Sequence, residues 1–169
     1  MAATRRRTIE WRDPVEAASL GKGLPGADYL SKIMVGAIPP PPIAVTLGFD
    51  LAEIGEGFAV FTLTPGEHHY NPLATMHGGV ICTLLDSAMS CAIHTVVPKG
   101  GAYTTAELKV NFVRPITRDT PPVRAEGRLI HRGRQLATAE GKLLDRTGRL
   151  YAHGVTTCLI FPAPEPGDV

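Results

Sequence analysis

The strongest pattern of apolar and polar positions lies in residues 76–93, where apolar residues occupy almost every face of a predicted helix. At about 100° per residue, Gly79, Thr83, Asp86 and Ser90 fall on one narrow polar stripe. A helix that is apolar almost all round is a core helix. Because burying an unpaired carboxylate costs several kcal/mol, Asp86 is either paired inside the core or functional.

We expect this helix to end near Val96. In the segments before and after it, apolar and polar residues alternate as they do in β-strands. Residues 104–114 show it best, with Ala106, Leu108, Val110 and Phe112 on one face and Thr105, Glu107, Lys109 and Asn111 on the other. The other predicted strands are 43–49, 57–64, 123–131, 135–145 and 150–161, with a turn at 53–56. A long apolar helix needs a partner, and a curved antiparallel sheet can supply it. One sheet face would cover the helix, and the other, with Thr105 and Lys109, would face solvent or another subunit.

The rest of the chain indicates a single domain at 26–163, with a loosely ordered arm at 1–25 and a tail at 164–169. A short helix is predicted at 28–35, with Asp28 as its N-cap and Gly36 as its stop. The four prolines at 39–42 predict an extended connector.

Composition and charge narrow the classes of function. A net charge of +1 does not indicate a nucleic-acid partner. The N-terminus has no apolar segment of the kind found in secretory signals, and no apolar run reaches the roughly 18 residues that cross a bilayer. Cys82, Cys91 and Cys158 are irregularly spaced, which fits reduced thiols in the cytoplasm. No metal-ligand spacing is present, so we expect no metal site. Because no apolar run is long enough to cross a bilayer, we also expect no membrane partner.

The start of the long helix adds a second chemical feature. The N–H groups of Gly78 and Gly79 belong to the first helical turn, where they lack intrahelical acceptors, and they could stabilise an oxyanion. With Asp86 as a base two turns later, this pattern suggests acyl chemistry. The alternative for Asp86 is a structural hydrogen bond to Thr83 or Ser90.

Other candidate residues keep two interpretations each. His77 is either a helix cap or a site residue, and Asn71 before Pro72 can simply begin a turn. Gly79, Thr83 and Ser90 are candidates for substrate contact on the polar stripe. The arginines at predicted turns and strand ends suit phosphate groups, or are ordinary surface charges: Arg114, Arg132 and Arg134.

The run Asn-Pro-Leu-Ala-Thr-Met-His-Gly-Gly at 71–79, followed by Thr-Leu-Leu-Asp-Ser-Ala at 83–88, resembles a known family. With residues 107–115 and 131–134, the chain is similar over roughly 40–161 to hotdog-fold acyl-CoA thioesterases of the phenylacetate-degradation branch, which are related to 4-hydroxybenzoyl-CoA thioesterases. The resemblance implies an α+β hotdog fold, in which a curved antiparallel sheet wraps one long central helix. Ala74 stands where the resemblance predicts glycine; if the position needs a positive φ, alanine is strained there.

The resemblance also implies roles for particular residues. Asp86 would act as nucleophile or as base for water, the Gly78 N–H would polarise the thioester carbonyl, and Thr105 would assist the water. Asn71 and His77 would help to place the substrate. The site would lie at a dimer interface, with Asp86 and Thr105 from one subunit and Asn71, His77 and Gly78 from the other, and dimers would pair into tetramers.

The sequence therefore predicts a cytoplasmic acyl-CoA thioesterase that releases coenzyme A from an aromatic or medium-chain acyl group and needs no bound cofactor. Two alternatives stay open. One is a hotdog dehydratase or hydratase acting on acyl thioesters, for which His77 would have to pair with Asp86 across the interface. The other is a non-catalytic acyl-CoA-binding protein.

Overall fold

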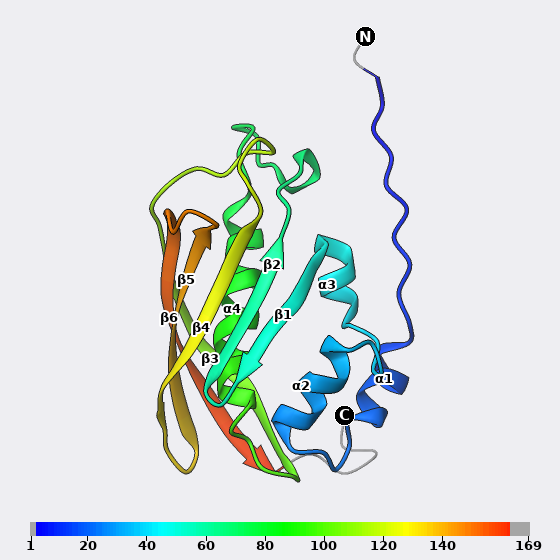
Figure 1. Ribbon diagram of the computed structural model, residues 1–169, viewed down its shortest axis with the longest axis vertical. Helices are drawn as coiled ribbons and strands as arrows, with labels where there is room; N and C mark the ends of the chain where they lie inside the picture. The colour runs from blue at the N-terminus through cyan, green and yellow to red at the C-terminus, as the bar shows by residue number, and fades with distance from the viewer. Residues whose placement is uncertain (1–2, 163–169) are drawn as a thin grey trace.

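The computed structural model describes residues 3–162, and Figure 1 shows a curved sheet wrapped around one long helix. All strand pairs are antiparallel, and the six strands lie in the order β1-β2-β4-β5-β6-β3. The elements are α1 (Pro14–Leu20), α2 (Gly26–Met34), α3 (Pro42–Leu47), β1 (Phe49–Gly55), β2 (Phe58–Leu63), η1 (Glu67–His69), α4 (Gly78–His94), β3 (Gly101–Phe112), β4 (Val123–Arg132), β5 (Leu136–Asp145) and β6 (Leu150–Pro162). The predicted combination of a curved antiparallel sheet and one long central helix is confirmed.

Helix α4 forms the centre of the core and lies very close to the sheet. Leu84, Leu85 and Met89 are fully buried. A side chain at Gly127 of β4 would collide with the backbone of α4 at Ala88, and one at Gly141 of β5 would lie 2.8 Å from Cγ of Met89. These two glycines therefore set the distance between the helix and the sheet.

The segment before β1 differs from the prediction. Residues 42–47 form the short helix α3 instead of a strand, and β1 starts only at Phe49. The β-branched residues of this segment suggested a strand, but Pro42 occupies the first helical position, where proline is favoured. Gly48, with φ 74°, ends the helix. The following turn is at residues 56–57 instead of 53–56.

The N-terminal region contains one helix that the sequence did not predict. Asp13 caps α1 by accepting a hydrogen bond from the Val15 N–H at 2.8 Å. Helix α2 begins at Gly26, after Pro25, so Asp28 lies within its first turn and is not its N-cap. The predicted tail at 164–169 lies outside the described residues.

A β-bulge in β3 changes which residues face the helix. Thr105 pairs with Cys158 of β6, but the next pair joins Glu107 to Thr157, so Ala106 is an extra residue. Thr105 consequently points towards α4. Its predicted place on the outer face beside Lys109 is wrong, because one inserted residue reverses the alternation.

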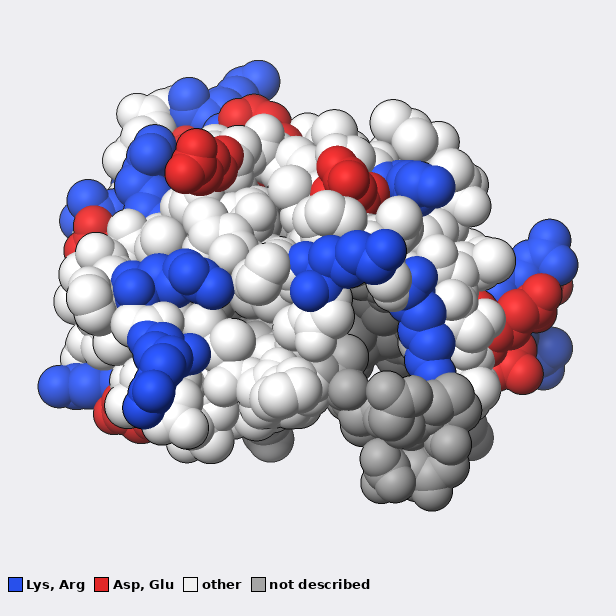
Figure 2. Space-filling view, turned by 90° about the horizontal axis from the view of Figure 1, so that it is seen from below, with Lys and Arg blue, Asp and Glu red and all other residues white. Residues whose placement is uncertain are grey.

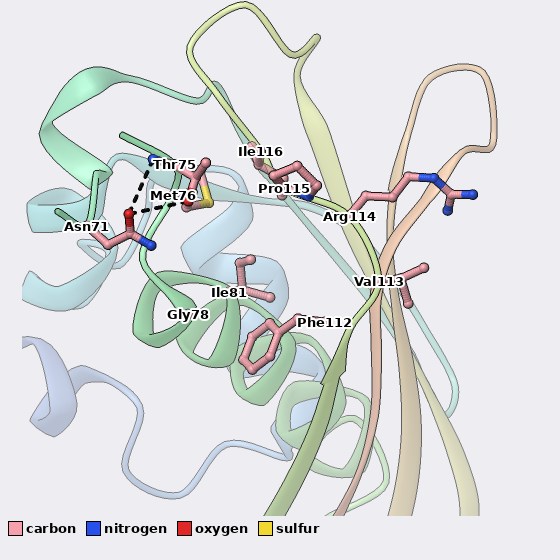
Figure 3. Close-up of a pocket in the computed structure, with 10 residues that line it drawn as sticks. All are labelled: Asn71, Thr75, Met76, Gly78, Ile81, Phe112, Val113, Arg114, Pro115 and Ile116. Atoms are coloured by element: carbon pink, nitrogen blue, oxygen red, sulfur yellow. Dashed lines mark hydrogen bonds between the residues drawn. The ribbon is translucent and has the colours of Figure 1, made fainter. Parts of the chain in front are cut away.

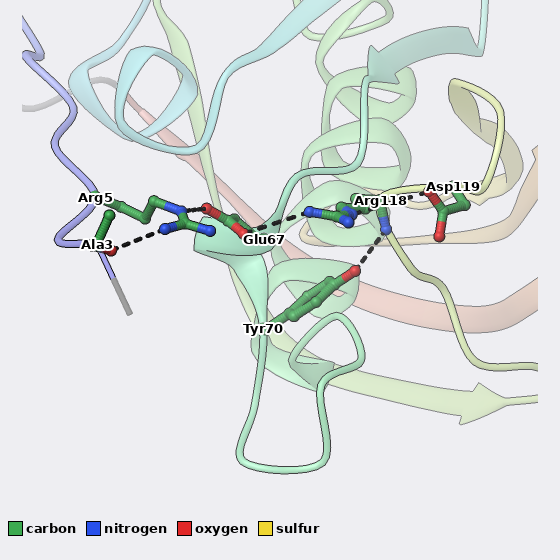
Figure 4. A network of polar contacts seen from close by, with 6 residues as sticks. All are labelled: Ala3, Arg5, Glu67, Tyr70, Arg118 and Asp119. Atoms are coloured by element: carbon green, nitrogen blue, oxygen red, sulfur yellow. Dashed lines mark hydrogen bonds and ion pairs between the residues drawn. The ribbon is translucent and has the colours of Figure 1, made fainter. Parts of the chain in front are cut away.

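The extended segment before α1 is fastened to two parts of the domain. Arg7 donates hydrogen bonds to the Thr46 and Val45 carbonyls at the end of α3, at 2.7 and 3.3 Å. Arg5 pairs with Glu67 at 2.7 Å, and Glu67 also faces Arg118 at 3.7 Å (Figure 4). These exposed ion pairs add little stability, but they link the segment to the loops that lead into α4 and follow β3.

Candidate active site

Asp86 lies on α4, where its carboxylate meets Thr105 on the bulged strand β3. The Thr105 hydroxyl donates to Oδ1 of Asp86 at 2.8 Å, and Sγ of Cys158 lies 3.9 Å from the same hydroxyl oxygen. Thr83 instead donates to the carbonyl of Gly79 at 2.9 Å, and within residues 3–162 no hydrogen bond joins Asp86 to Thr83 or Ser90. Oδ2 of Asp86 has no protein donor in the same range. One carboxylate oxygen is thus held in place and the other is available to a water or a substrate.

A cavity of about 450 Å³ extends from Asp86 along the C-terminal half of α4. Ser90, predicted to contact substrate, is one of the residues that line it. Its other walls come from α2, the segment around α3, β1, β2 and β3: Tyr29, Leu30, Ile33, Pro41, Ile43, Phe49, Leu51, Phe61, Ser87, Cys91, His94, Tyr103, Thr104 and Thr105. Asp86 is the one carboxyl side chain among these lining residues, and none of them is Lys or Arg.

The far end of this cavity is aromatic. The His94 ring lies between Tyr29 and Tyr103, with centroid separations of 5.6 and 4.8 Å. Burial lowers the pKa of His94 to about 4, so its imidazole is neutral at pH 7. Burial also raises the pKa of the Cys91 thiol to about 12, so this thiol is a packing residue and not a nucleophile.

The start of α4 lies in a different place, beside a second cavity of about 380 Å³ (Figure 3). Its walls are Asn71, Thr75, Met76, Gly78, Ile81, Phe112, Val113, Arg114, Pro115 and Ile116. Among the described residues, the Gly78 N–H has no hydrogen-bond acceptor. A free donor at a helix N-terminus beside a cavity is suited to a developing negative charge.

His77 and Gly79 are occupied with each other. The Gly79 N–H donates to Nδ1 of His77 at 2.9 Å, so His77 is the N-cap of α4. Gly79 therefore cannot offer this N–H to a substrate in the present arrangement. Thr83, bonded to the Gly79 carbonyl, lines neither of these two cavities.

Asn71 organises the loop that precedes α4. Its Oδ1 accepts hydrogen bonds from the Leu73 N–H at 2.9 Å and from the N–H and hydroxyl of Thr75, each at 3.3 Å (Figure 3). Since Asn71 also lines the second cavity, its amide nitrogen is the part available to a ligand.

Ala74, in this loop, is the one non-glycine residue with positive φ in the part of the chain that the structure describes, at 57°. Left-handed backbone costs an L-residue about 1–2 kcal/mol, which explains why the resemblance predicts glycine here.

Replacement of Ala74 by glycine is expected to raise the free energy of unfolding by about 0.5–1 kcal/mol, because relief of this strain exceeds the entropy that glycine loses on folding. Urea denaturation measures the change. Ala18→Gly, at an exposed position within helix α1 whose φ is not positive, is the control and should destabilise. Equal destabilisation by both substitutions would contradict the strain at Ala74.

The three candidate arginines are not together. Arg114 lines the second cavity, but its guanidinium donates to the Leu150 carbonyl at 2.6 Å and points away from the other lining residues in Figure 3. Arg132 and Arg134 line a third depression of about 590 Å³ with Lys99 and Gln135. Figure 2 views this end of the molecule, where Lys and Arg side chains are spread among uncharged residues.

The candidate residues thus form two half-sites within one protomer. Asp86, Thr105 and Ser90 line one cavity, and Asn71 and Gly78 line the other. Gly78 and Asp86 are eight residues apart on one helix, which corresponds to about 12 Å along its axis. The Gly78 N–H and the Asp86 carboxylate of one chain therefore cannot contact the same carbonyl group.

Tyr29, His94 and Tyr103 were missed in the sequence, although one signal pointed to His94. Asp86, Ser90 and His94 are spaced i, i+4 and i+8, so His94 continues the polar stripe by one more turn.

Within the described residues, no group of three or more His, Cys, Asp or Glu side chains could hold a metal ion. None of the helices in this range is long and apolar enough to cross a membrane.

Comparison with known proteins relates this chain to one family of sequences and supports the fold. Residues 73–152 match the sequence model of the Thioesterase superfamily. The acyl-coenzyme A thioesterase PaaI of Escherichia coli is 29% identical over 110 residues, which are 64% of this chain and 75% of that protein.

Two solved structures share the architecture. A phenylacetic acid degradation-related protein of Ralstonia eutropha is 26% identical with a TM-score of 0.70, over 78% of this chain and 98% of that one. The structure of E. coli PaaI aligns with a TM-score of 0.70 at 22% identity, over 82% of this chain and 95% of that one. The predicted hotdog fold is confirmed.

Proposed function

We propose that this protein, a thioester hydrolase of the Thioesterase superfamily, hydrolyses acyl-CoA to a free acid and coenzyme A at a site shared by two subunits. The observation that carries the proposal is the Asp86–Thr105 pair at one end of a largely apolar cavity. A thioester could place its acyl group in this cavity and its carbonyl carbon beside the available carboxylate oxygen.

In this proposal Asp86 supplies the nucleophile. Its free oxygen either attacks the carbonyl carbon directly, forming an anhydride that water then opens, or takes a proton from the attacking water. In both routes the C–S bond breaks and the thiolate of coenzyme A leaves. Thr105 fixes the rotamer of the carboxylate through its 2.8 Å hydrogen bond.

The oxyanion donor would come from the second subunit. Strand β3 forms an edge of the sheet, and Phe112 and Val113 are 55% and 44% exposed beside the second cavity. Pairing of two copies along this edge would cover these side chains and bring the Gly78 N–H of one copy towards Asp86 of the other. Asn71 and the His77 cap would hold the donor loop in place, and one such donor typically contributes about 3 kcal/mol.

Dimers of this kind could pair into tetramers through the outer face of the sheet. That face carries exposed apolar side chains on three neighbouring strands: Ile130, Leu136, Val155, Leu159 and Phe161. Apolar surface of this kind is typical of subunit contacts.

The phosphate groups of coenzyme A require cationic partners. Arg132 and Arg134 lie together with Lys99 around one depression and are the strongest candidates. Arg114 would have to release the Leu150 carbonyl to take part. The three cysteines are free thiols, consistent with the reducing cytoplasm that we propose as the location.

The hydratase alternative receives less support from the geometry. Its chemistry would need a histidine next to the acid, but Nδ1 of His77 is engaged in capping and His94 lies about 12 Å along the helix from Asp86. A non-catalytic binding protein would have no use for a carboxylate held with one oxygen free in an apolar cavity.

A coenzyme A release assay tests the proposed function. With a thiol-reactive dye and a panel of phenylacetyl-, benzoyl- and straight-chain acyl-CoA, the purified protein is expected to turn over at least one thioester. Binding of acyl-CoA without release of thiol from any member of the panel would contradict the proposal in favour of a binding protein. Hydration of an enoyl-CoA, measured as the loss of the absorbance of its conjugated double bond, would support the hydratase instead.

A further inference from the structure

The cavity beside Asp86 is walled in part by a segment outside the region that matches the Thioesterase superfamily. Tyr29, Leu30 and Ile33 of α2 and Ile43 of α3 line it, whereas the match begins at residue 73. This part of the wall comes from the N-terminal region of the chain, and its Tyr29 packs on the His94 ring, two turns along α4 from Asp86.

Helix α2 is held firmly against the end of α4. The Gly26 N–H donates to the Val97 carbonyl at 3.0 Å, and any side chain at Gly26 would collide with the His94 backbone. Tyr29, one turn later, packs on the His94 ring. Since the backbones of α2 and α4 are in direct contact, this end of the cavity cannot open without moving α2.

The distance from the carboxylate to this closed end sets a length. Asp86, Ser90 and His94 lie on one face of α4, and the rise from Asp86 to His94 is about 12 Å. An extended alkyl chain, with C–C bonds of about 1.5 Å, advances by roughly 1.3 Å per carbon. A straight chain that begins at Asp86 therefore meets the Tyr29–His94–Tyr103 cluster after about eight or nine carbons.

The walls also restrict the charge of the acyl group. No Lys or Arg lines the cavity, and burial lowers the pKa of His94 to about 4, so its imidazole is not a cation at pH 7. A carboxylate at the far end of the acyl chain would be desolvated without a cationic partner, beside the uncharged rings of Tyr29, His94 and Tyr103.

We propose that α2 and His94 form a length stop for the acyl group, which restricts the substrate to a neutral acyl chain of about eight carbons or a ring of the same reach. This inference rests on the proposed function, since it takes the thioester carbonyl to lie at Asp86. It names His94 and Tyr29 as residues that determine specificity.

Binding and turnover are measured separately to test the stop. Non-hydrolysable thioether analogues of butyryl-, octanoyl-, dodecanoyl- and adipoyl-CoA are titrated calorimetrically into the wild type, His94→Ala, Tyr29→Ala and the control His153→Ala, which is exposed on β6. In the wild type, affinity is expected to rise by roughly fourfold per added methylene up to octanoyl and then stop rising. The adipoyl analogue, which is no longer than octanoyl but ends in a carboxylate, should bind at least about tenfold more weakly than octanoyl.

His94→Ala and Tyr29→Ala enlarge the cavity, and each is expected to raise the dodecanoyl-to-octanoyl affinity ratio by at least about tenfold. The acyl chain length at which kcat/KM is highest should also increase in both variants. His153→Ala should leave both profiles unchanged. Should His94→Ala fold poorly, Tyr29→Leu shortens the same wall with less loss of packing.

The outcomes separate the two proposals. An unchanged chain-length profile in folded Tyr29 and His94 variants of an active enzyme overturns the length stop and leaves the hydrolase intact. A protein that releases no coenzyme A but shows the expected length dependence in binding keeps the stop and contradicts the hydrolase. Tight binding of the adipoyl analogue overturns the restriction to neutral groups.

Discussion

Replacement of Asp86 by asparagine is expected to lower acyl-CoA turnover by about a thousand-fold while the protein remains folded and oligomeric. An amide can still accept the hydrogen bond from Thr105, which is 2.8 Å away, so the local geometry is kept. It can neither attack a carbonyl nor take a proton from water, and a positioned base or nucleophile typically accounts for a factor of about 10²–10⁴. Coenzyme A release under saturating substrate measures the loss.

A matched control separates chemistry from a general effect of removing a carboxylate. Asp50→Asn lies on the exposed side of β1 and should keep full activity. Binding of a thioether analogue should survive in Asp86→Asn, since the cavity is unchanged. Wild-type turnover in that variant would mean that Asp86 is a structural residue and that the reaction occurs elsewhere.

A mixture of two inactive variants is expected to regain roughly a quarter of the wild-type activity, if each site takes Asp86 from one subunit and Gly78 from its partner. Gly78→Pro removes the free N–H at the first helical position, where proline is well tolerated. In a mixed dimer with Asp86→Asn, one site carries both changes and the other carries neither. Random association makes half of the dimers mixed, so about a quarter of all sites are intact.

The recovery requires exchange of subunits, which native mass spectrometry of tagged variants can follow. Each variant unfolded and refolded alone should stay inactive. A side chain at position 78, such as that of the Gly78→Pro variant, would lie 3.1 Å from the Phe112 ring. Because this ring is exposed, it can move by the small amount that the substitution requires. Mixed dimers that form without any recovery of activity would refute the shared site.

The long helix and most strands could be predicted from the sequence because their patterns are local. Apolar residues on almost every face of the segment 76–93 indicate a buried helix, and strict alternation from Thr105 onward indicates a strand. The bulge at Ala106 has no such signal, because an inserted residue changes the facing of its neighbours without changing their composition. For this reason Thr105 was placed at the site only by resemblance, and on the wrong face by pattern.

The aromatic end of the cavity could not be predicted for a different reason. Tyr29 and His94 are far apart in the sequence, and only the docking of α2 through Gly26 brings their rings together. Helix α3 was misread because β-branched residues favour strands, whereas proline at the first helical position favoured the helix. Contacts that depend on the packing of separate elements leave no periodicity in either partner.

The elements packed on the two sides of α4 differ in how much their sequences can change, because on the sheet side Gly127 and Gly141 lie directly against the helix. A change on the α2 side alters what the cavity accepts and leaves the helix where it is. A side chain at Gly127 would push against Ala88, two residues from Asp86, and would displace the carboxylate from Thr105 in the same step. Directed evolution of new substrate preferences can therefore draw on the cavity-lining residues Tyr29, Ile33 and Ile43, while these two sheet positions tolerate only hydrogen.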